Sequence, residues 1–230
     1  KAAVNQTAFT ASTDTSRPVL TGVYWHTFEG YLYLAATDGY RLSEKKVCEC
    51  DEEISAIITT SSLQEVMRAI SDSTEEIEIY IDENQAEFRI DDIVIVSRLI
   101  DGKFVDYRRL IPNDTETKVE ISKPDFMRVV KIAALFARDS GGSITIHADG
   151  ENSKLSIHSI ASEFGENTSE ADAEIFGEGE VTLNSNYLLK GISALNGEDI
   201  QFGFSGKLAP TVLKDQKDPD YIHIIMPLKS

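Results

Sequence analysis

Few residues of this 230-residue chain are spaced for catalysis or metal binding. Its two cysteines, Cys48 and Cys50, lie two positions apart on an expected strand, so their side chains point the same way and bridging is geometrically poor. A metal site would need further ligands close by. The four histidines are scattered along the chain, at His26, His147, His158 and His223. We therefore expect free thiols, buried or half-buried, and neither a metal nor a cofactor.

Acidic pairs are the other candidates for chemistry, because neighbouring carboxylates can serve as acid and base. Asp91-Asp92 and Glu75-Glu76 fall in expected turns between strands, where a solvated turn is the simpler interpretation. The sequence also lacks a glycine-rich phosphate loop and a serine or cysteine nucleophile motif. The residues by themselves therefore point to no catalytic site.

Three segments have residue types suited to peptide binding. Residues 36–42 (ATDGYRL) surround a tight turn, and residues 224–229 (IIMPLK) form an apolar tail. Residues 99–112 (LIDGKFVDYRRLIP) have neither helical nor strand periodicity and are typical of a structured connector. A connector and a chain end can meet where two domains adjoin, and grooves form there. Ordinary packing at a domain junction is the alternative for each segment taken singly.

The connector lies near the midpoint and divides the chain into two predicted domains, residues 1–113 and 114–230. Each half is expected to hold two helices and short antiparallel strands, an α+β architecture. A pattern of strand, capped helix, acidic turn and strand starts near Thr60 and again near Asn184, which indicates an internal duplication.

The predicted helices cover residues 2–13, a segment capped by Ser61 or Ser62, residues 124–138, and a segment capped by Asn184 or Ser185. The predicted strands cover residues 19–28, 31–37, 40–47, 57–59, 77–81, 85–90, 93–98, 144–148, 155–160, 171–176, 181–183, 201–204, 211–213 and 221–225. Residues 161–168 are expected to form a loop.

The net charge of -17 argues against a protein that grips nucleic acid through its whole surface. Arg128, Lys131 and Arg138 nevertheless fall within about 80° of one another on the predicted helix, forming a basic stripe. An ordinary solvated helix face is the alternative. Leu135 lies on the same polar side, and an exposed leucine there indicates a protein contact. No apolar run approaches the ~20 residues of a membrane span, so we expect a soluble, cytoplasmic protein.

Four motifs together resemble the bacterial sliding clamp family, the beta subunit of DNA polymerase III. They are ATDGYRL, LIDGKFVDYRRLIP, the opening Arg17-Pro18-Val19-Leu20-Thr21-Gly22 and the terminal MPLK. They occur in the family's order and spacing over nearly the whole chain. The resemblance implies two tandem DNA-clamp domains, the middle and C-terminal ones of three, without the N-terminal domain and the first strand of the middle one.

The resemblance implies a processivity factor without catalysis. Rings of this family encircle and slide on duplex DNA at the nucleoid, and they tether DNA polymerase, the clamp loader and repair proteins. Partners insert short hydrophobic motifs into a groove between the two domains, with apolar anchors inside and arginines at the rim. By position, the groove would comprise Arg17, Leu20, Thr37, Gly39, Tyr40, Arg41, Leu42, Arg109, Leu110, Ile224, Met226, Pro227 and Leu228.

The same resemblance implies a homodimeric ring closed partly through Leu135 and Phe136. The partner surface belongs to the N-terminal domain, so this chain is not expected to close a ring by itself. The cations facing DNA would be Arg68, Arg128, Lys131 and Lys190. Two alternatives from other classes are an acidic α+β enzyme or ligand-binding protein with a site at the domain junction, and a purely structural repeat protein.

Overall fold

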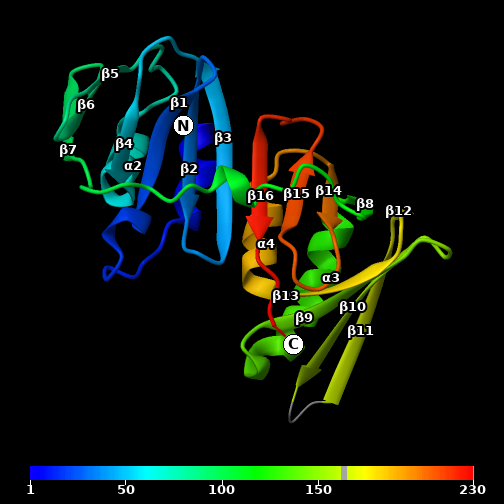
Figure 1. Cartoon of the computed structure of the whole chain (residues 1–230). Coiled ribbons are helices and arrows are strands. Elements are labelled where there is room, and N and C mark those ends of the chain that lie inside the picture. The colour runs from blue at the N-terminus through cyan, green and yellow to red at the C-terminus, as the bar shows by residue number, and fades with distance from the viewer. Residues whose placement is uncertain (162–164, 230) are drawn as a thin grey trace. The chain divides into compact units, whose positions relative to one another are not determined.

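The computed structural model describes residues 1–161 and 165–229 (Figure 1). The chain separates into two compact units, Lys1–Asp106 and Tyr107–Ser230. This division lies inside the connector predicted at residues 99–112, whereas the expected boundary followed residue 113. The short helical turn η3 (Arg108–Leu110) therefore belongs to the second unit.

The first unit packs two helices against antiparallel strands. Strands β3, β2, β1 and β4 lie side by side in that order, and β5, β6 and β7 form a separate meander (Figure 1). The elements are α1 (Ala2–Thr7), η1 (Ala8–Thr10), η2 (Pro18–Leu20), β1 (Gly22–Phe28), β2 (Tyr31–Thr37), β3 (Arg41–Glu49), β4 (Ser55–Thr59), α2 (Thr60–Ala69), β5 (Glu78–Ile81), β6 (Gln85–Ile90) and β7 (Ile93–Arg98).

The amphipathic strands and helices of this unit bury their apolar faces in one core. Ala86, Phe88 and Ile90 of β6 are buried on one side of the meander, as their alternation predicts. Helix α2 buries Leu63 and Val66 in the same cluster. Its N-cap is Thr59, because the Thr59 hydroxyl accepts the Ser62 backbone N–H at 3.2 Å; the predicted caps Ser61 and Ser62 lie in the first turn instead.

The second unit has the same kinds of elements. One sheet has the strand order β12-β8-β14-β15-β16 and the other β11-β10-β9-β13. The elements are β8 (Thr117–Ser122), α3 (Lys123–Phe136), η4 (Ala137–Ser140), β9 (Ser143–Asp149), β10 (Lys154–Ala161), β11 (Gly165–Asp172), β12 (Glu174–Phe176), β13 (Gly179–Asn184), α4 (Ser185–Ala194), β14 (Asp199–Phe204), β15 (Thr211–Asp215) and β16 (Tyr221–Ile225).

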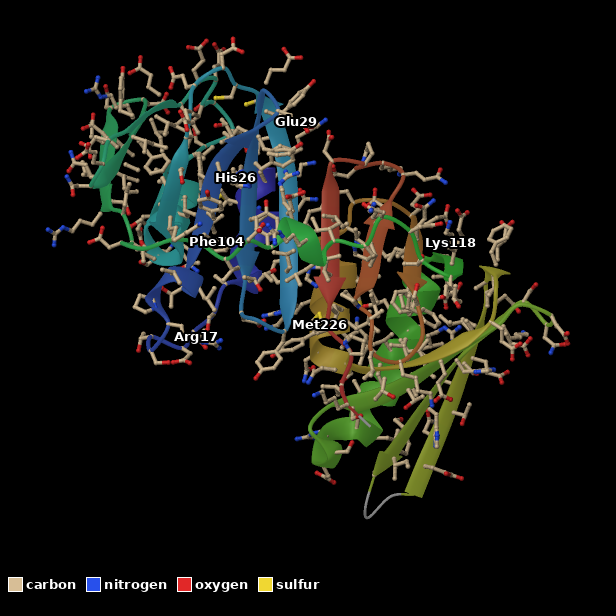
Figure 2. The ribbon with its side chains drawn as sticks, viewed as in Figure 1. Arg17, His26, Glu29, Phe104, Lys118 and Met226 are labelled. Atoms are coloured by element: carbon tan, nitrogen blue, oxygen red, sulfur yellow. The ribbon has the colours of Figure 1, made fainter. Side chains whose placement is uncertain are left out.

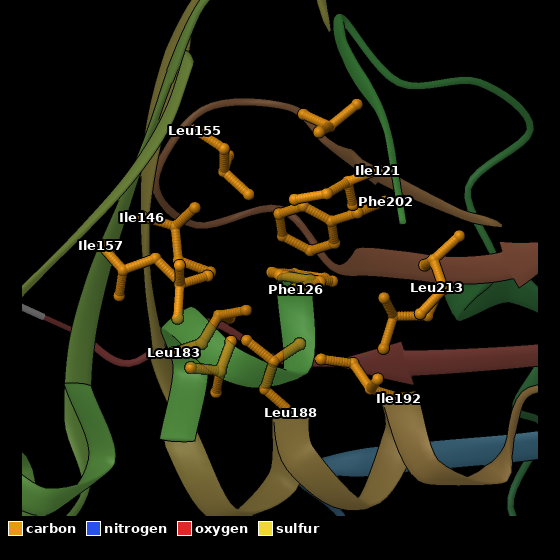
Figure 3. Close-up of a cluster of buried hydrophobic side chains, with 14 of the residues drawn as sticks. Ile121, Phe126, Ile146, Leu155, Ile157, Leu183, Leu188, Ile192, Phe202 and Leu213 are labelled. Atoms are coloured by element: carbon orange, nitrogen blue, oxygen red, sulfur yellow. The ribbon is translucent and has the colours of Figure 1, made fainter. Parts of the chain in front are cut away.

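The core of the second unit lies between its helices and its sheets (Figure 3). Phe126 of α3 packs against Phe202 of β14, with ring centroids 5.6 Å apart. Leu188 and Ile192 of α4 are fully buried in the same cluster. Both helices thus turn one apolar stripe inward and leave the opposite stripe, which carries their cations, on the surface.

The structure confirms the predicted α+β class, because each unit combines helices with antiparallel strands. It differs from the sequence prediction at several elements. Strand β8 was not predicted, and part of the strand expected at residues 19–28 is the helical turn η2. The predicted loop at 161–168 is replaced from Gly165 onward by β11, while residues 162–164 lie outside the described residues. None of the helices in the described parts of the chain is long and apolar enough to cross a membrane.

Candidate functional site

The turn between β2 and β3, residues 37–42, is held by a dense set of hydrogen bonds. The Thr37 hydroxyl donates to the Arg41 carbonyl oxygen at 2.6 Å and accepts the Gly39 N–H at 3.0 Å. The Asp38 Oδ1 accepts the backbone N–H groups of Tyr40 and Arg41 at 2.9 and 3.0 Å. Gly39 has φ +94°, a conformation that favours glycine. The turn therefore has one well-defined conformation.

A second loop of the first unit lies beside this turn. A Cβ built on Gly39 would lie 3.5 Å from Nη1 of Arg17, so the Arg17 side chain reaches the turn (Figure 2). The Ser12 N–H donates to the Leu20 carbonyl oxygen at 2.8 Å, which closes the loop that carries both Arg17 and Leu20. Folding thus brings together the predicted groove residues of the first unit, which are separated by about twenty positions in the sequence.

The predicted groove residues of the first unit divide into exposed side chains and buried ones. Tyr40 is 60% exposed and Arg17 is also exposed. Leu20, Thr37 and Leu42 are buried. Arg41 is only 6% exposed, which corrects the prediction that it frames the rim of a groove. Its guanidinium is held inside the unit by Asp38, a residue absent from the predicted set; the Asp-Gly turn signal at Asp38 is the sequence feature that points to it.

The predicted groove residues of the second unit lie on η3 and at the end of the chain. Arg109 and Leu110 are exposed on η3. Ile224 is buried in β16. Met226, Pro227 and Leu228 are half-buried, and the Leu228 N–H donates to the Thr182 carbonyl oxygen of β13 at 2.9 Å. This hydrogen bond fixes the end of the chain against the second unit, and Met226 lies on the segment that leads to it (Figure 2).

The predicted contact and DNA-facing residues lie on helices. Leu135, near the end of α3, is 68% exposed, and its neighbour Phe136 is half-buried. Arg68 of α2 is ion-paired with Glu65, and Arg128 of α3 with Asp125 at 3.0 Å.

Lys131 of α3 and Lys190 of α4 are exposed, and no ion pair involves either of them within residues 1–161 and 165–229. These two lysines are therefore less neutralised locally than the arginines.

The thiols and carboxylates do not assemble into a reactive centre in the described residues. Cys48 and Cys50 are free, but Cys48 is exposed rather than buried or half-buried, because it lies in the exposed last part of β3. Partial burial, together with the neighbouring Cys50, raises the pKa of the Cys48 thiol, which disfavours a reactive thiolate. No group of three or more histidine, cysteine, aspartate or glutamate side chains is placed to hold a metal ion in the parts of the chain described.

The two α+β units in tandem make this chain a DNA-clamp protein. The family model for the DNA polymerase III beta subunit, central domain, matches residues 1–106, and that for its C-terminal domain matches residues 108–229. The chain belongs to the DNA polymerase III beta subunit family.

Individual relatives are consistent with this family assignment. The chain is 32% identical over 231 residues to the Beta sliding clamp of Staphylococcus epidermidis, covering 99% of this chain and 61% of the relative. The DNA polymerase sliding clamp from Bacillus subtilis superposes with a TM-score of 0.94 at 28% identity, covering 100% of this chain and 62% of that one. The DNA polymerase III beta chain of Streptococcus pneumoniae gives a TM-score of 0.92 at 30% identity, with coverage of 100% and 62%. The chain thus spans about three fifths of the length of the curated relatives it matches.

Proposed function

We propose that the chain supplies the central and C-terminal domains of a sliding clamp, a non-catalytic processivity factor of a DNA polymerase. In the complete ring, the clamp would encircle duplex DNA and tether polymerase, clamp loader and repair proteins in the bacterial cytoplasm. Family membership supports this proposal, and so do the two tandem clamp domains.

The tethering site is proposed to be a groove for short hydrophobic peptide motifs. The observation that carries this proposal is the rigid turn at residues 37–42, which presents the exposed Tyr40 beside Arg17. Within the second unit, the exposed Leu110 and the half-buried Met226 are the apolar side chains proposed for peptide binding. Exposed aromatic and apolar side chains held by a rigid backbone are suited to anchoring a peptide, because little conformational entropy is lost on binding.

The charge distribution is consistent with sliding. With a net charge of -17, the chain as a whole repels phosphate, so the cations on its helices are the candidates for contacts with DNA. A closed ring holds DNA by topology, so its contacts can be weak and readily exchanged. Lys131 and Lys190 are the cations best placed for this role because no ion pair involves them in the described residues.

Ring closure is proposed to use the end of α3. Leu135 is a large exposed apolar side chain, and its half-buried neighbour Phe136 adds apolar surface beside it. Contiguous exposed apolar surface marks sites of protein contact. The proposed ring is a homodimer of the longer protein, in which this surface meets the N-terminal domain of the other subunit.

Titration with a fluorescent peptide bearing a Gln-Leu-x-Leu-Phe motif tests the peptide groove. We expect saturable binding that is weakened at least about tenfold by Met226→Ala or Tyr40→Ala. Leu42→Asp is unsuited to this purpose, since Leu42 is 3% exposed and a buried aspartate would disturb the fold itself. The matched control is Val94→Ala, which shortens an exposed apolar side chain on β7.

If the parent chain binds the peptide and both groove variants bind it equally well, the proposed site is wrong. A complete lack of binding would favour the acidic enzyme or ligand-binding alternative. Thermal melting of every variant separates loss of the groove from loss of the fold.

A further inference from the structure

Arg41 is a buried cation in the middle of the proposed peptide site. Its Nε donates to the Asp38 Oδ2 at 2.9 Å, and its Nη2 donates to the Phe9 carbonyl oxygen at 3.0 Å. The guanidinium carbon also lies 5.5 Å from the centre of the Phe9 ring. One side chain therefore ties the turn to η1, a segment about thirty positions earlier in the sequence.

Asp38 uses its two oxygens for different tasks. Oδ2 pairs with the Arg41 guanidinium, and Oδ1 accepts the backbone N–H groups of Tyr40 and Arg41. The carboxylate thereby links the ion pair to the backbone that carries Tyr40. The Arg41 guanidinium fixes Asp38, and Asp38 fixes the backbone on either side of the Tyr40 side chain.

The side chains of Arg41, Asp38 and Tyr40 differ in exposure, which indicates different roles. The side chains of Arg41 and Asp38 are 6% and 13% exposed, so neither is free to reach a ligand without breaking the ion pair. Breaking a buried pair leaves an uncompensated charge, which is strongly unfavourable. Tyr40 is the exposed side chain between them and has both an apolar ring and a hydroxyl to offer.

We infer that Arg41 is a positioning residue: with Asp38 it locks the turn at residues 37–42 against Phe9, so that Tyr40 meets the peptide in a preset orientation. The inference rests on the proposed peptide-binding function. It assigns ligand discrimination at this turn to the phenol of Tyr40. The matching peptide group is then an apolar side chain next to a hydrogen-bonding partner, and no acidic group is required opposite Arg41.

The first test compares Arg41→Lys and Asp38→Asn in the full 230-residue chain. Lysine keeps the positive charge but lacks the planar fork that bonds Asp38 and the Phe9 carbonyl together. We expect each variant to bind the Gln-Leu-x-Leu-Phe peptide about tenfold more weakly, and the double variant to lose no more than either single one, because the pair acts as a unit. Arg89→Lys, which changes an exposed arginine ion-paired with Glu87 on β6, is the matched control and is expected to change affinity less than about twofold.

Two further measurements separate positioning from direct contact. Amide hydrogen exchange at Tyr40 and Arg41 is expected to rise in both variants, since these N–H groups are bonded to Asp38. A peptide whose central residue is changed from a neutral to an acidic one should show the same affinity ratio in the parent and in Arg41→Lys. A ratio that changes between the two would reveal a direct charge contact and overturn the inference.

Thr37→Val is the second variant, in case Arg41→Lys does not fold. It removes two turn hydrogen bonds and no charge, and the same direction of effect is expected. A parent chain that binds the peptide, with Arg41→Lys and Thr37→Val binding equally well, would overturn the positioning role alone. A parent chain that does not bind would overturn the proposed function together with this inference.

Discussion

The imidazole of His223 fills the space left by the missing side chain of Gly191. A Cβ built on Gly191 in α4 would lie 2.5 Å from Cδ2 of His223, whose ring is fully buried on β16. The Leu213 Cδ1 atom would lie 2.9 Å away on the neighbouring strand β15. Helix α4 can approach this sheet so closely only because position 191 carries no side chain.

Gly191→Ala is therefore expected to destabilise the chain although alanine favours helices. The gain in helix propensity is about 1 kcal/mol, and overpacking a buried contact costs about 1 to 3 kcal/mol. We expect a net loss of about 1 kcal/mol in the free energy of unfolding, measured by urea denaturation. Ser193→Ala, at an exposed position of the same helix, should change it by less than about 0.5 kcal/mol. Equal stability of Gly191→Ala and the parent would refute the close contact.

The N-terminus of α3 is expected to lose stability in acid. The Ser122 hydroxyl donates to the Asp125 Oδ2 at 2.7 Å, and Arg128 donates to Oδ1 at 3.0 Å. These hydrogen bonds, the one from Ser122 foremost, hold the pKa of Asp125 below its ordinary value of 3.8. Because the folded pKa is lowered, the stabilisation is fully present above the ordinary value and is lost as the pH falls through the folded pKa.

The comparison that tests this is the melting temperature of the parent and Asp125→Asn as a function of pH. The parent should be the more stable at pH about 6, and the difference should vanish only once the pH has fallen through the lowered, folded-state pKa of Asp125. Asp92→Asn makes the same charge change on the turn between β6 and β7. If the two variants lost stability with the same pH profile, the effect would come from net charge and not from the hydrogen bonds of Asp125 with Ser122 and Arg128.

The two helical lysines should dominate weak DNA binding. Lys131→Ala combined with Lys190→Ala is expected to weaken duplex binding at low salt and to reduce the salt slope by about 1 to 2, since each phosphate contact releases about one counterion. Fluorescence anisotropy at several salt concentrations measures this. Lys207→Ala combined with Lys217→Ala removes the same charge from lysines paired with Glu180 and Glu198. Similar slopes for the two double variants would rule out a specific role for α3 and α4.

Leu135 should matter for assembly and not for folding. Leu135 and Leu208 are both 68% exposed, so Leu135→Asp and Leu208→Asp are each expected to change the free energy of unfolding by less than about 0.5 kcal/mol. In a chain extended by the N-terminal domain of a family member, only Leu135→Asp should abolish the dimer seen in sedimentation velocity. A dimer that tolerates this substitution would place the subunit contact elsewhere.

Periodic strands were predictable because their signal is local. The bounds of β2, β6, β7 and β16 agree with the sequence prediction. Polar and apolar residues alternate along β6, whereas β7 and β16 are short runs rich in β-branched residues, which favour strands. Strand β8 also alternates, yet it was missed beside the stronger connector and helix signals. It becomes a strand by pairing with β14, whose residues lie far along the chain. Strand β11 likewise depends on its pairing with β10, which outweighs a composition rich in polar residues and glycine.

Local residue patterns were enough to recognise the duplication, the α+β class and the clamp family, because motifs such as ATDGYRL retain their order whatever the surrounding packing. They were not enough to say which members of that motif face solvent. Arg41 and Tyr40 are neighbours and both polar-tipped, but folding carries the Phe9 carbonyl to Arg41 and leaves Tyr40 uncovered. Burial is a property of the neighbours that the fold supplies, so the division into framework and binding side chains required the three-dimensional arrangement.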